Sequence, residues 1–283
     1  MKKLLTLALS SLLALSLLAG CGSNNTAASG SASASTGETV TLKVGASITP
    51  HAEILAQCKA ILAEQGIDLE VVEYTDYVQP NTALEDGSLD ANYFQHINYL
   101  NWFNSEYGTH LVSAASVHYE PFGIYAGKVA SIADLKDGDE VIIPNDGSNE
   151  TRALLLLQQE GIITLKDGIT AASNATVQDI ASYSVNITIR EMEAAQLTIS
   201  LPDVALAVIN GNYALQGGLN AATDALAIES ADGDAAQEYG NILAVKEGHE
   251  NDPAILALID VLHSDTIRNF INNTYGGAVV PTF

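Results

Sequence analysis

Residues 140–161 read EVIIPNDGSNETRALLLLQQEG. The apolar residues at the start of this stretch predict a buried strand, and the Pro, Asn, Asp and Gly that follow are typical of a tight turn. The leucine-rich run that begins at Asn149 predicts a helix that ends at Gly161, with Ser148 as its cap. The stretch therefore predicts a strand, a turn and a helix in direct succession.

The same alternation of strands and helices extends outward from this stretch in both directions. Further strands are expected at residues 40–44, 69–74, 111–116, 123–126, 188–191, 204–209 and 242–245. Further helices are expected at residues 50–64, 81–86, 91–103 and 253–270. Alternation of this kind favours an α/β fold, in which parallel sheets are covered by helices on both faces.

The composition is that of a folded, acidic protein. The chain has 283 residues, of which 47% are hydrophobic, so it can form two lobes or one large domain. It carries 11 Lys and Arg against 34 Asp and Glu, a formal net charge of -23. Such a surface repels phosphate backbones and anionic lipid headgroups, which argues against nucleic-acid binding.

Residues 1–20 have the pattern of an export signal, because two lysines precede an apolar run that is too short for a permanent transmembrane helix. The run ends in Leu18-Ala-Gly-Cys21, which resembles the bacterial lipobox and implies cleavage before Cys21 and acylation of its thiol, for example with palmitate. The alternative is a plain secretory signal followed by an incidental cysteine. Residues 21–39 are small and polar, which predicts a flexible tether of roughly 20–25 Å. The sequence thus predicts a protein that is lipid-anchored to the cell membrane on its extracytoplasmic face.

The second cysteine, Cys58, falls on an apolar helical stripe with Leu55 and Leu62. A cysteine in that setting is expected to be a small core residue rather than a reactive thiol. Because Cys21 is expected to carry lipid, no disulfide is expected within the folded part of the chain.

Motifs that carry catalysis or bind phosphate are missing from the sequence. It has no Gly-x-x-x-x-Gly-Lys-Ser/Thr, Gly-x-Gly-x-x-Gly, Gly-x-Ser-x-Gly or His-Glu-x-x-His pattern. We therefore expect a binding protein that is not an enzyme and holds no cofactor or metal. One alternative is an enzyme with an unrecognised pair of carboxylates. Another is a zinc site made of His51, His96 and His118 with a carboxylate, although their spacings match no compact ligand pattern.

Arg152 stands out in this acidic chain. It is one of three arginines, with Arg190 and Arg268, and lies one turn into the helix that follows the predicted turn. A helix N-terminus and a guanidinium together suit a carboxylate, because the helix dipole and the bidentate donors act on the same anion. Ligands of open α/β sheets also lie at the carboxyl ends of strands. Arg152 is therefore a candidate carboxylate receptor, and the alternative is an ordinary arginine on a helix surface.

Residues 90–103 combine aromatic and amide side chains. On the helix expected there, Tyr93 and His96 share one face, and Phe94 points about 100° away from them. The alternative interpretation is that Phe94 fills the core and that His96 caps a helix or lies at the surface.

Several longer blocks of sequence belong together. They are PHAEIL (50–55), DYVQPN (76–81), DANYFQH (90–96), EPFGIY (120–125), IPNDGSNETR (143–152), AVINGNYA (207–214) and GGAV (276–279). In these blocks, and in their order from about residue 41 to the C-terminus, the chain resembles the NlpA/MetQ family of lipoproteins, the substrate-binding components of methionine ABC importers.

This resemblance implies a two-lobed, periplasmic-binding-protein-like α/β fold with a ligand cleft between the lobes. The chain is then expected to cross between the lobes near residues 120–125 and to return near residues 226–230. Lobe 1 would comprise residues 40–121 plus 229–283, and lobe 2 would comprise residues 122–228.

The resemblance also implies a set of ligand-binding residues. Arg152 and Asn149 would hold the α-carboxylate of the ligand, and Asn210 would bond the backbone of an amino acid. The slot for the ligand's side chain would be lined by Tyr77, Phe94, His96 and His118.

The implied function is that of a substrate-binding lipoprotein, which captures L-methionine or a close derivative and delivers it to a permease driven by an ATPase. The zwitterionic head of methionine suits an arginine and amide site, and its thioether suits an aromatic slot. Phe122, Thr198 and Ile199 differ from the residues usual in the family, which leaves a methionine-containing dipeptide or another amino acid as alternatives. A zinc-binding transport lipoprotein is the remaining alternative.

Overall fold

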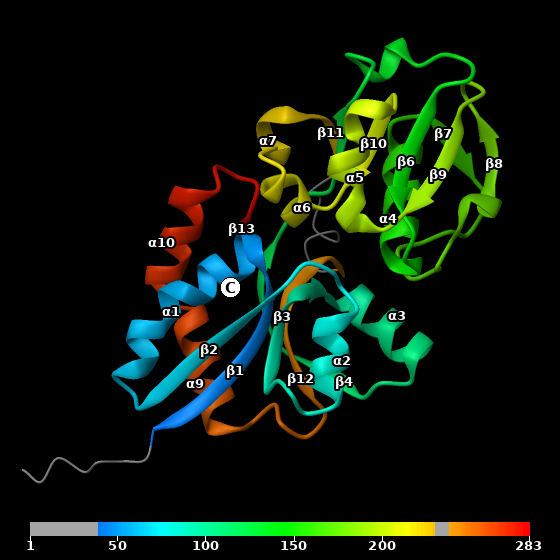
Figure 1. The fold of residues 1–283 in the computed structure, drawn as a ribbon. Helices are drawn as coiled ribbons and strands as arrows, with labels where there is room; N and C mark the ends of the chain where they lie inside the picture. The colour runs from blue at the N-terminus through cyan, green and yellow to red at the C-terminus, as the bar shows by residue number, and fades with distance from the viewer. Residues whose placement is uncertain (1–38, 230–237) are drawn as a thin grey trace, which may run out of the picture. The chain divides into compact units, whose positions relative to one another are not determined.

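The computed structural model describes residues 39–229 and 238–283. The predicted signal peptide (1–20), the predicted lipid-bearing Cys21 and all but the last residue of the predicted tether (21–39) lie outside the described residues. Within the described ranges, strands and helices alternate and form two separate large sheets (Figure 1). The predicted α/β class is thereby confirmed.

The first sheet has six strands in the order β13-β4-β12-β3-β1-β2. Their bounds are Val40–Ser47 (β1), Ile67–Tyr74 (β2), Ala91–His96 (β3), Leu111–Tyr119 (β4), Gly240–Lys246 (β12) and Val280–Pro281 (β13). Strand β1 runs parallel to β2 and β3, whereas β12 runs antiparallel to β3 and β4. Strand β12, from the C-terminal part of the chain, therefore lies between β3 and β4 at the centre of this sheet.

Helices cover both faces of the first sheet. Helices α1, α9 and α10 pack together on one face, and α2 and α3 pack on the other. The bounds are Ile48–Ala52 (η1), Glu53–Ala63 (α1), Gln79–Glu85 (α2), Ile97–Tyr107 (α3), Pro253–Leu262 (α9) and Asp265–Thr274 (α10). Side chains of β12 alternate between these faces, so that Leu243 packs toward α1 and α9, and Ile242 packs toward α2 and α3. Cys58 of α1 is fully buried, as predicted, and burial raises the pKa of its thiol to about 12.

The second sheet has five strands in the order β11-β5-β10-β6-β9. Their bounds are Gly123–Ala126 (β5), Glu140–Pro144 (β6), Thr188–Met192 (β9), Leu206–Ile209 (β10) and Ala225–Ile228 (β11). Strand β6 runs parallel to β9 and β10, whereas β5 runs antiparallel to β10 and β11. A separate antiparallel pair is formed by β7 (Ile163–Leu165) and β8 (Ile180–Tyr183).

Helices also flank the second sheet. Their bounds are Ile132–Asp134 (η2), Gly147–Gln159 (α4), Val177–Asp179 (η3), Ala194–Ser200 (α5), Leu201–Asp203 (η4), Gly211–Gln216 (α6) and Ala221–Asp224 (α7). Successive residues of β6 face opposite sides of the sheet, so that Val141 packs with Leu154 of α4 and Ile142 packs with Leu197 of α5. Among the described residues, no helix combines the length and the apolar character that crossing a bilayer requires.

The predicted helix at residues 91–103 is wrong in its first half. Residues Ala91–His96 form strand β3, and helix α3 follows it. All six residues of β3 are buried, and the strand pairs with β1 on one side and β12 on the other. Pairing with partners that are distant in sequence outweighs the local helical periodicity. His96 therefore shares no helix face with Tyr93 and is instead the N-cap of α3, where its Nδ1 accepts from the Tyr99 N–H at 3.1 Å.

Three further predictions are corrected by the structure. Both large sheets are mixed rather than parallel, because β12 and β5 run against their neighbours. The single helix expected at residues 253–270 is two helices, because α9 ends at Leu262 and Ser264 is the N-cap of α10. Helix α4 is capped by Asp146, whose Oδ1 accepts the Asn149 N–H at 2.9 Å, while Ser148 lies inside the helix.

Candidate functional site

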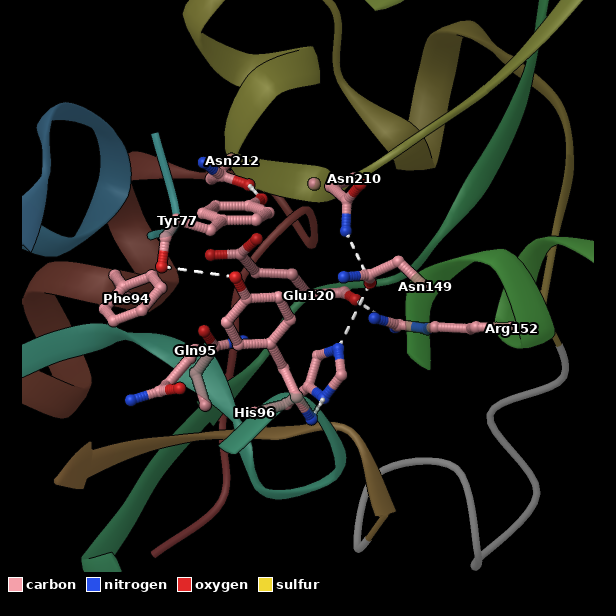
Figure 2. Close-up of a pocket in the computed structure, with 12 residues that line it drawn as sticks. Tyr77, Phe94, Gln95, His96, Glu120, Asn149, Arg152, Asn210 and Asn212 are labelled. Carbon is pink, nitrogen blue, oxygen red and sulfur yellow. Dashed lines mark hydrogen bonds between the residues drawn. The ribbon is translucent and has the colours of Figure 1, made fainter. Parts of the chain in front are cut away.

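A pocket lies between the two sheets, at the edge where β3, β6 and β10 end (Figure 2). The first sheet, its loops and helix α3 contribute Tyr77, Phe94, Gln95, His96, Tyr99, Glu120 and Asn241. The segments that follow β6 and β10 contribute Asn149, Arg152, Asn210, Gly211 and Asn212. The position matches the general rule that ligands of α/β sheets bind at the carboxyl ends of strands.

Asn149, in the first turn of α4, connects the two sides of the pocket. Its Nδ2 donates to the Asp146 carboxylate at 3.0 Å, which fixes the orientation of the amide. Its Oδ1 then accepts from Asn210 Nδ2 at 2.8 Å and lies 3.2 Å from His96 Nε2. These contacts hold the amide in one place, so Asn149 is a preorganised polar group.

His96 presents a neutral ring to the pocket. Its Nδ1 accepts from the Tyr99 N–H, so the ring proton lies on Nε2 and is donated to Asn149 Oδ1. Burial, together with the positive charge of Arg152, lowers the pKa of His96 to about 3. The ring is therefore uncharged at neutral pH and serves as an aromatic wall and a hydrogen-bond donor.

Arg152 is buried and forms an ion pair that the sequence analysis did not predict. Its Nε donates to Glu229 Oε2 at 2.8 Å, and its Nη2 donates to Glu229 Oε1 and to the carbonyl oxygen of Glu120. The guanidinium lies over the rings of Phe122 and Tyr239, 4.7 and 4.1 Å from their centroids. Burial is the largest single influence and lowers the pKa of Arg152, but the charge and hydrogen bonds of Glu229, together with Tyr119 and Tyr239, outweigh it, so the pKa is raised. The pocket therefore holds a permanent positive charge that is already paired with one carboxylate.

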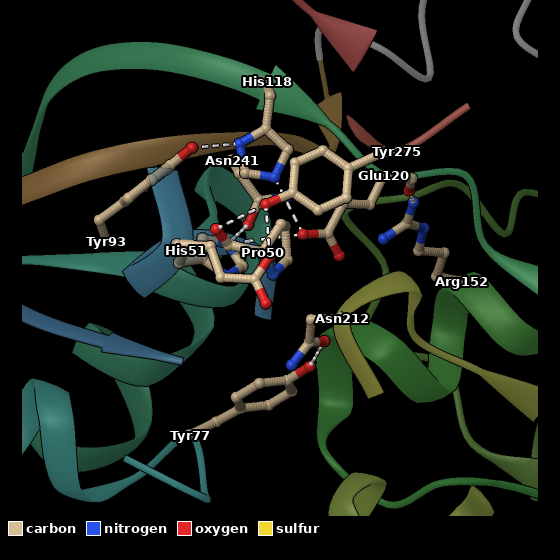
Figure 3. Close-up of polar contacts among 11 residues, drawn as sticks. Pro50, His51, Tyr77, Tyr93, His118, Glu120, Arg152, Asn212, Asn241 and Tyr275 are labelled. Atoms are coloured by element: carbon tan, nitrogen blue, oxygen red, sulfur yellow. Dashed lines mark hydrogen bonds and ion pairs between the residues drawn. The ribbon is translucent and has the colours of Figure 1, made fainter. Parts of the chain in front are cut away.

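Glu120 is a second buried carboxylate of the pocket, and its closest partners are imidazoles (Figure 3). Its Oε1 lies 2.9 Å from His118 Nε2 and 3.5 Å from His51 Nε2. The Tyr93 hydroxyl donates to His118 Nδ1, which leaves the proton on Nε2 for the carboxylate. Burial lowers the pKa of His51 to about 4 and of His118 to about 3, and it raises the pKa of Glu120. In the described part of the chain, no lysine or arginine forms an ion pair with the Glu120 carboxylate.

His51, His118 and Glu120 are also the one group of potential metal ligands found together in residues 39–229 and 238–283. Their ligand atoms lie within 4.8 Å of one another. His96, the third histidine of the zinc alternative, is not among them, because it lies at the N-terminus of α3. The Nε2 atoms of both histidines are already hydrogen-bonded within the protein, since His51 Nε2 lies 2.9 Å from Asn241 Oδ1 and His118 Nε2 contacts Glu120. Among the described residues, His51 Nδ1 has no hydrogen-bond partner. The rest of the cluster forms a hydrogen-bonded network behind the pocket.

Two asparagines of the pocket each have one buried amide atom without a hydrogen-bond partner among the described residues. These atoms are Asn210 Oδ1, an acceptor, and Asn212 Nδ2, a donor. The other ends of the two amides are fixed, because Asn210 Nδ2 donates to Asn149 and Asn212 Oδ1 accepts from the Tyr77 hydroxyl at 2.5 Å. Leaving such atoms unpaired costs about 1–3 kcal/mol each. The pocket thus suits a ligand that carries both a hydrogen-bond donor and an acceptor.

The structure brings most of the predicted ligand-binding residues to this pocket. Those that line it are Tyr77, Phe94, His96, Asn149, Arg152 and Asn210. His118 does not line it and contacts it only through the carboxylate of Glu120. The sequence analysis missed Glu120 and Asn212, although both lie in the blocks that carry the family resemblance, and it missed Glu229, which lies in none of them.

Comparison with known proteins places this chain and its fold in a family. Residues 42–283 match the NlpA lipoprotein family. The chain belongs to that family. This NlpA lipoprotein is similar to the methionine-binding lipoprotein MetQ of Bacillus subtilis, with 40% identity over 271 residues, which cover 94% of this chain and 93% of the relative. It is also 37% identical over 242 residues to the D-methionine-binding lipoprotein MetQ of Salmonella typhi, which cover 84% of this chain and 87% of that one.

Solved structures also resemble this chain over most of its length. A lipoprotein from Ruminococcus gnavus is 54% identical with a TM-score of 0.84, covering 86% of this chain and 99% of that one. A nutrient-binding protein from Burkholderia cenocepacia, solved bound to methionine, is 41% identical with a TM-score of 0.82, covering 86% and 100%. A periplasmic substrate-binding protein of an ABC transporter from Coxiella burnetii is 38% identical with a TM-score of 0.79, covering 85% and 99%. The predicted family and the predicted periplasmic-binding-protein-like fold are confirmed.

Proposed function

We propose that this NlpA lipoprotein is the substrate-binding component of an ABC importer and that it captures L-methionine or a close derivative. Two relatives support the ligand class, since one is named a methionine-binding lipoprotein and another was solved with methionine. The observation that carries the proposal is the composition of the pocket. Its buried charges and unpaired amide atoms lie beside a set of aromatic rings, as a zwitterion with an apolar side chain requires.

The α-carboxylate of the ligand is assigned to Arg152, to the unpaired Nδ2 of Asn212 and to Asn149, whose Nδ2 then shares its donors between the Asp146 carboxylate and the ligand. A guanidinium has five N–H donors. The bonds of Arg152 to Glu229 and to the Glu120 carbonyl use Nε and Nη2, so the Nη1 edge is the one that we assign to the ligand. Arg152 then holds two carboxylates at once, one from the protein and one from the ligand.

The α-ammonium is assigned to the carboxylate of Glu120 and to the unpaired Oδ1 of Asn210. A buried carboxylate whose partners are neutral imidazoles is costly unless a cation approaches it. The ligand's ammonium supplies that cation. We therefore expect the pocket to favour amino acids over carboxylic acids that lack the amine.

The side chain of methionine is assigned to the slot formed by Tyr77, Phe94 and His96. The rings of Tyr77 and Phe94 lie 5.7 Å apart, and both residues line the pocket. Each contact between sulfur and an aromatic ring stabilises the complex by about 0.3–1.5 kcal/mol, and burial of the side chain contributes about 1.5–3 kcal/mol. His118 acts on the ligand only through Glu120 in this assignment.

We further propose that the two sheets are the cores of two lobes, with residues 40–121 plus 229–283 in one and residues 122–228 in the other. The supporting observation is that the chain changes sheets between β4 and β5 and again between β11 and β12. Hydrogen bonds such as that from Tyr77 to Asn212 then cross the cleft, which couples ligand binding to closure of the lobes.

The proposed role requires binding and release without chemistry, so no catalytic residue, metal or cofactor is assigned. The protein would act at the extracytoplasmic face of the membrane, tethered through an acylated Cys21, and would pass its ligand to a permease and its ATPase. A methionine-containing dipeptide or another amino acid are the alternative ligands, and a transported zinc ion is the alternative from another class.

Thermal unfolding of the full-length protein with a panel of ligands tests the proposal. Methionine should raise the melting temperature by mass action, and 4-(methylthio)butanoic acid, which lacks the amine, should not. Calorimetry should show that Arg152→Lys and Asn210→Ala each weaken methionine binding by about tenfold or more, because each loses a hydrogen bond to a charged group. Asn272→Ala, on an exposed part of α10, is the matched control. A melting temperature that responds to zinc and to no amino acid contradicts the proposal.

A further inference from the structure

A second cavity lies beside the methionine pocket and shares Tyr77 and Tyr99 with it. Its walls come from the loop after β2, from α3 and α6, and from the segments that follow β6 and β9. The assignments made above for the head and the side chain of methionine use none of its remaining residues. Its chemistry differs from that of the first pocket.

One wall of this cavity is a continuous row of aromatic rings. The centroids of Tyr213 and Tyr77 lie 5.0 Å apart, and those of Tyr77 and Tyr99 lie 5.5 Å apart. The row continues through Trp102, 5.3 Å from Tyr99, to Tyr107, 6.1 Å from Trp102. The faces of such rings carry a negative potential that attracts cations.

Three carboxylates from three separate segments line the same cavity. They belong to Asp76, Asp146 and Glu193. No lysine or arginine lines the cavity, and within residues 39–229 and 238–283 none forms an ion pair with these carboxylates. Burial is the largest cause that raises the pKa of Tyr213, and the negative charges of the three carboxylates raise it further. The electric field of the carboxylates therefore reaches the aromatic wall.

Two kinds of cation can be compared with these walls. A metal ion needs several oxygen or nitrogen ligands close together, and the described residues bring no three acidic groups of this cavity near enough for that. A weakly hydrated organic cation needs instead aromatic faces and nearby negative charge. The cavity offers both on different walls.

We propose that this cavity binds a compact organic cation of the alkylammonium or sulfonium class, held between the aromatic row and the carboxylates of Asp76 and Glu193. The cation is either a free molecule or the charged end of a ligand whose amino-acid head lies in the first pocket. The second source rests on the proposed function. In that case Tyr77 and Tyr99, which line both cavities, lie along the ligand where an S-alkylated methionine carries its sulfonium.

Trp102 makes the cavity directly observable, because it is the one tryptophan of the sequence and lies in the aromatic row. Tetramethylammonium chloride, titrated into the full-length protein, should change the tryptophan emission in a saturable way. Sodium chloride at equal ionic strength and 2,2-dimethylpropanol, a neutral molecule of similar shape, should not. An equal response to the alcohol or to sodium chloride overturns the proposal.

Matched double variants test the carboxylates. Asp76→Asn with Glu193→Gln should weaken tetramethylammonium binding by about tenfold or more, because two charges near the cation are lost while the side-chain shapes are kept. Glu64→Gln with Asp68→Asn removes the same charge from exposed positions outside the cavity and should leave the affinity unchanged. Equal losses in the two double variants overturn the proposal, because they would reflect only the net charge of the protein.

Calorimetry with methionine and S-methylmethionine separates the two sources. If the cation is the end of a longer ligand, the Asp76 and Glu193 double variant loses affinity for S-methylmethionine and keeps its affinity for methionine. If the cation is a free molecule, tetramethylammonium binds, and the affinity for S-methylmethionine is no higher than the affinity for methionine. Failure of both cations to change the Trp102 emission overturns the inference even where methionine binds, whereas tetramethylammonium binding without methionine binding contradicts the proposed function alone.

Discussion

Two buried glutamates lie beside Arg152 and differ in what surrounds their charge. The Glu229 carboxylate receives bonds from Nε and Nη2 of Arg152. The Glu120 carboxylate faces His118 and His51, two imidazoles that burial keeps neutral (Figure 3). Both residues are at least nine-tenths buried, so burial alone does not separate their roles. The charge of the partner separates their roles. Arg152 neutralises the Glu229 carboxylate, whereas the Glu120 carboxylate has no lysine or arginine partner among the described residues.

The difference extends to the surroundings of each carboxylate. Glu229 Oε1 also accepts from the Phe122 N–H at 3.1 Å and from the Tyr119 hydroxyl at 2.5 Å. Its hydrogen-bonding capacity is thus largely used by the fold. Gly211 packs directly on the stem of Glu120, where a Cβ would lie 2.6 Å from the Glu120 Cβ. The Glu120 side of the pocket is therefore the side that carries Asn212, with its unpaired amide donor.

Breaking the Glu229 pair should have the largest effect on stability. Glu229→Ala leaves Arg152 buried and uncompensated, which should lower the free energy of unfolding by about 3–5 kcal/mol. Chemical denaturation of the full-length protein measures this loss. Arg190→Ala, which removes the exposed pair between Arg190 and Glu140, is the control and should cost far less. Equal losses in the two variants would show that the Arg152 pair is not the structural element inferred here.

The imidazole side should respond to pH in a way that the ion pair does not. Burial holds the pKa of His51 at about 4, below its ordinary value of 6.5, so the unfolded chain takes up a proton more readily than the folded one. The contribution of His51 to the free energy of unfolding is therefore complete above pH 6.5. It falls by about 3 kcal/mol as the pH decreases toward 4.

The variant His51→Gln should make this part of the stability curve less steep, measured by denaturation between pH 7 and pH 4, while His96 and His118, whose pKa values burial also lowers, keep their own contributions. The exposed His110→Gln should leave it unchanged. A slope that is the same in His51→Gln and in the unmodified protein would place the pH response elsewhere.

These contacts also mark the limit of what the sequence could predict. The turn and helix around Asn149 and Arg152 could be predicted, because the apolar strand, the turn residues and the leucine run are all local signals. The role of Glu229 could not, since it contacts Arg152 across 77 residues and no local pattern marks it. Strand β3 could not be predicted for the same reason, because its conformation depends on pairing with β1 and β12, which are distant in sequence.

Glu120 represents an intermediate case. It lies in a block that carries the family resemblance, but its pairing with neutral histidines depends on the register of the strands. His118 and Glu120 are two residues apart at the end of β4, whereas His51 reaches them from η1. Sequence spacing could bring His118 near Glu120, but only the folded sheet shows that no basic side chain among the described residues joins them.

Removing the Glu120 charge should have a smaller effect than breaking the ion pair, and it should appear in binding. Glu120→Gln should weaken methionine binding by about tenfold or more, because the ligand's ammonium loses a charged acceptor. Burial raises the pKa of Glu120, so the methionine affinity of the unmodified protein should fall with decreasing pH at a point above the ordinary carboxyl pKa of 4.5. Titration calorimetry from pH 7 to pH 4 measures both effects.

The Glu120→Gln variant should show no such pH dependence, because an amide does not titrate. Glu85→Gln, which removes a carboxylate that pairs with His110 and Lys246 outside the pocket, is the matched control. Unchanged affinity in Glu120→Gln would contradict the assignment of the ammonium.

The smallest expected effect tests the Asn212 side of the pocket with a single hydroxyl. Tyr77→Phe keeps the aromatic ring but removes the O–H that holds Asn212 Oδ1, a bond worth about 0.5–1.5 kcal/mol. Methionine affinity, measured by calorimetry, should fall a few-fold because the Asn212 amide is no longer fixed toward the ligand. Tyr213→Phe is the control, since its hydroxyl donates instead to the Thr75 carbonyl oxygen at 3.1 Å. If the two variants lose affinity equally, the aromatic rings and not the orientation of Asn212 govern binding, and the unpaired amide donor beside Glu120 has no part in holding the carboxylate.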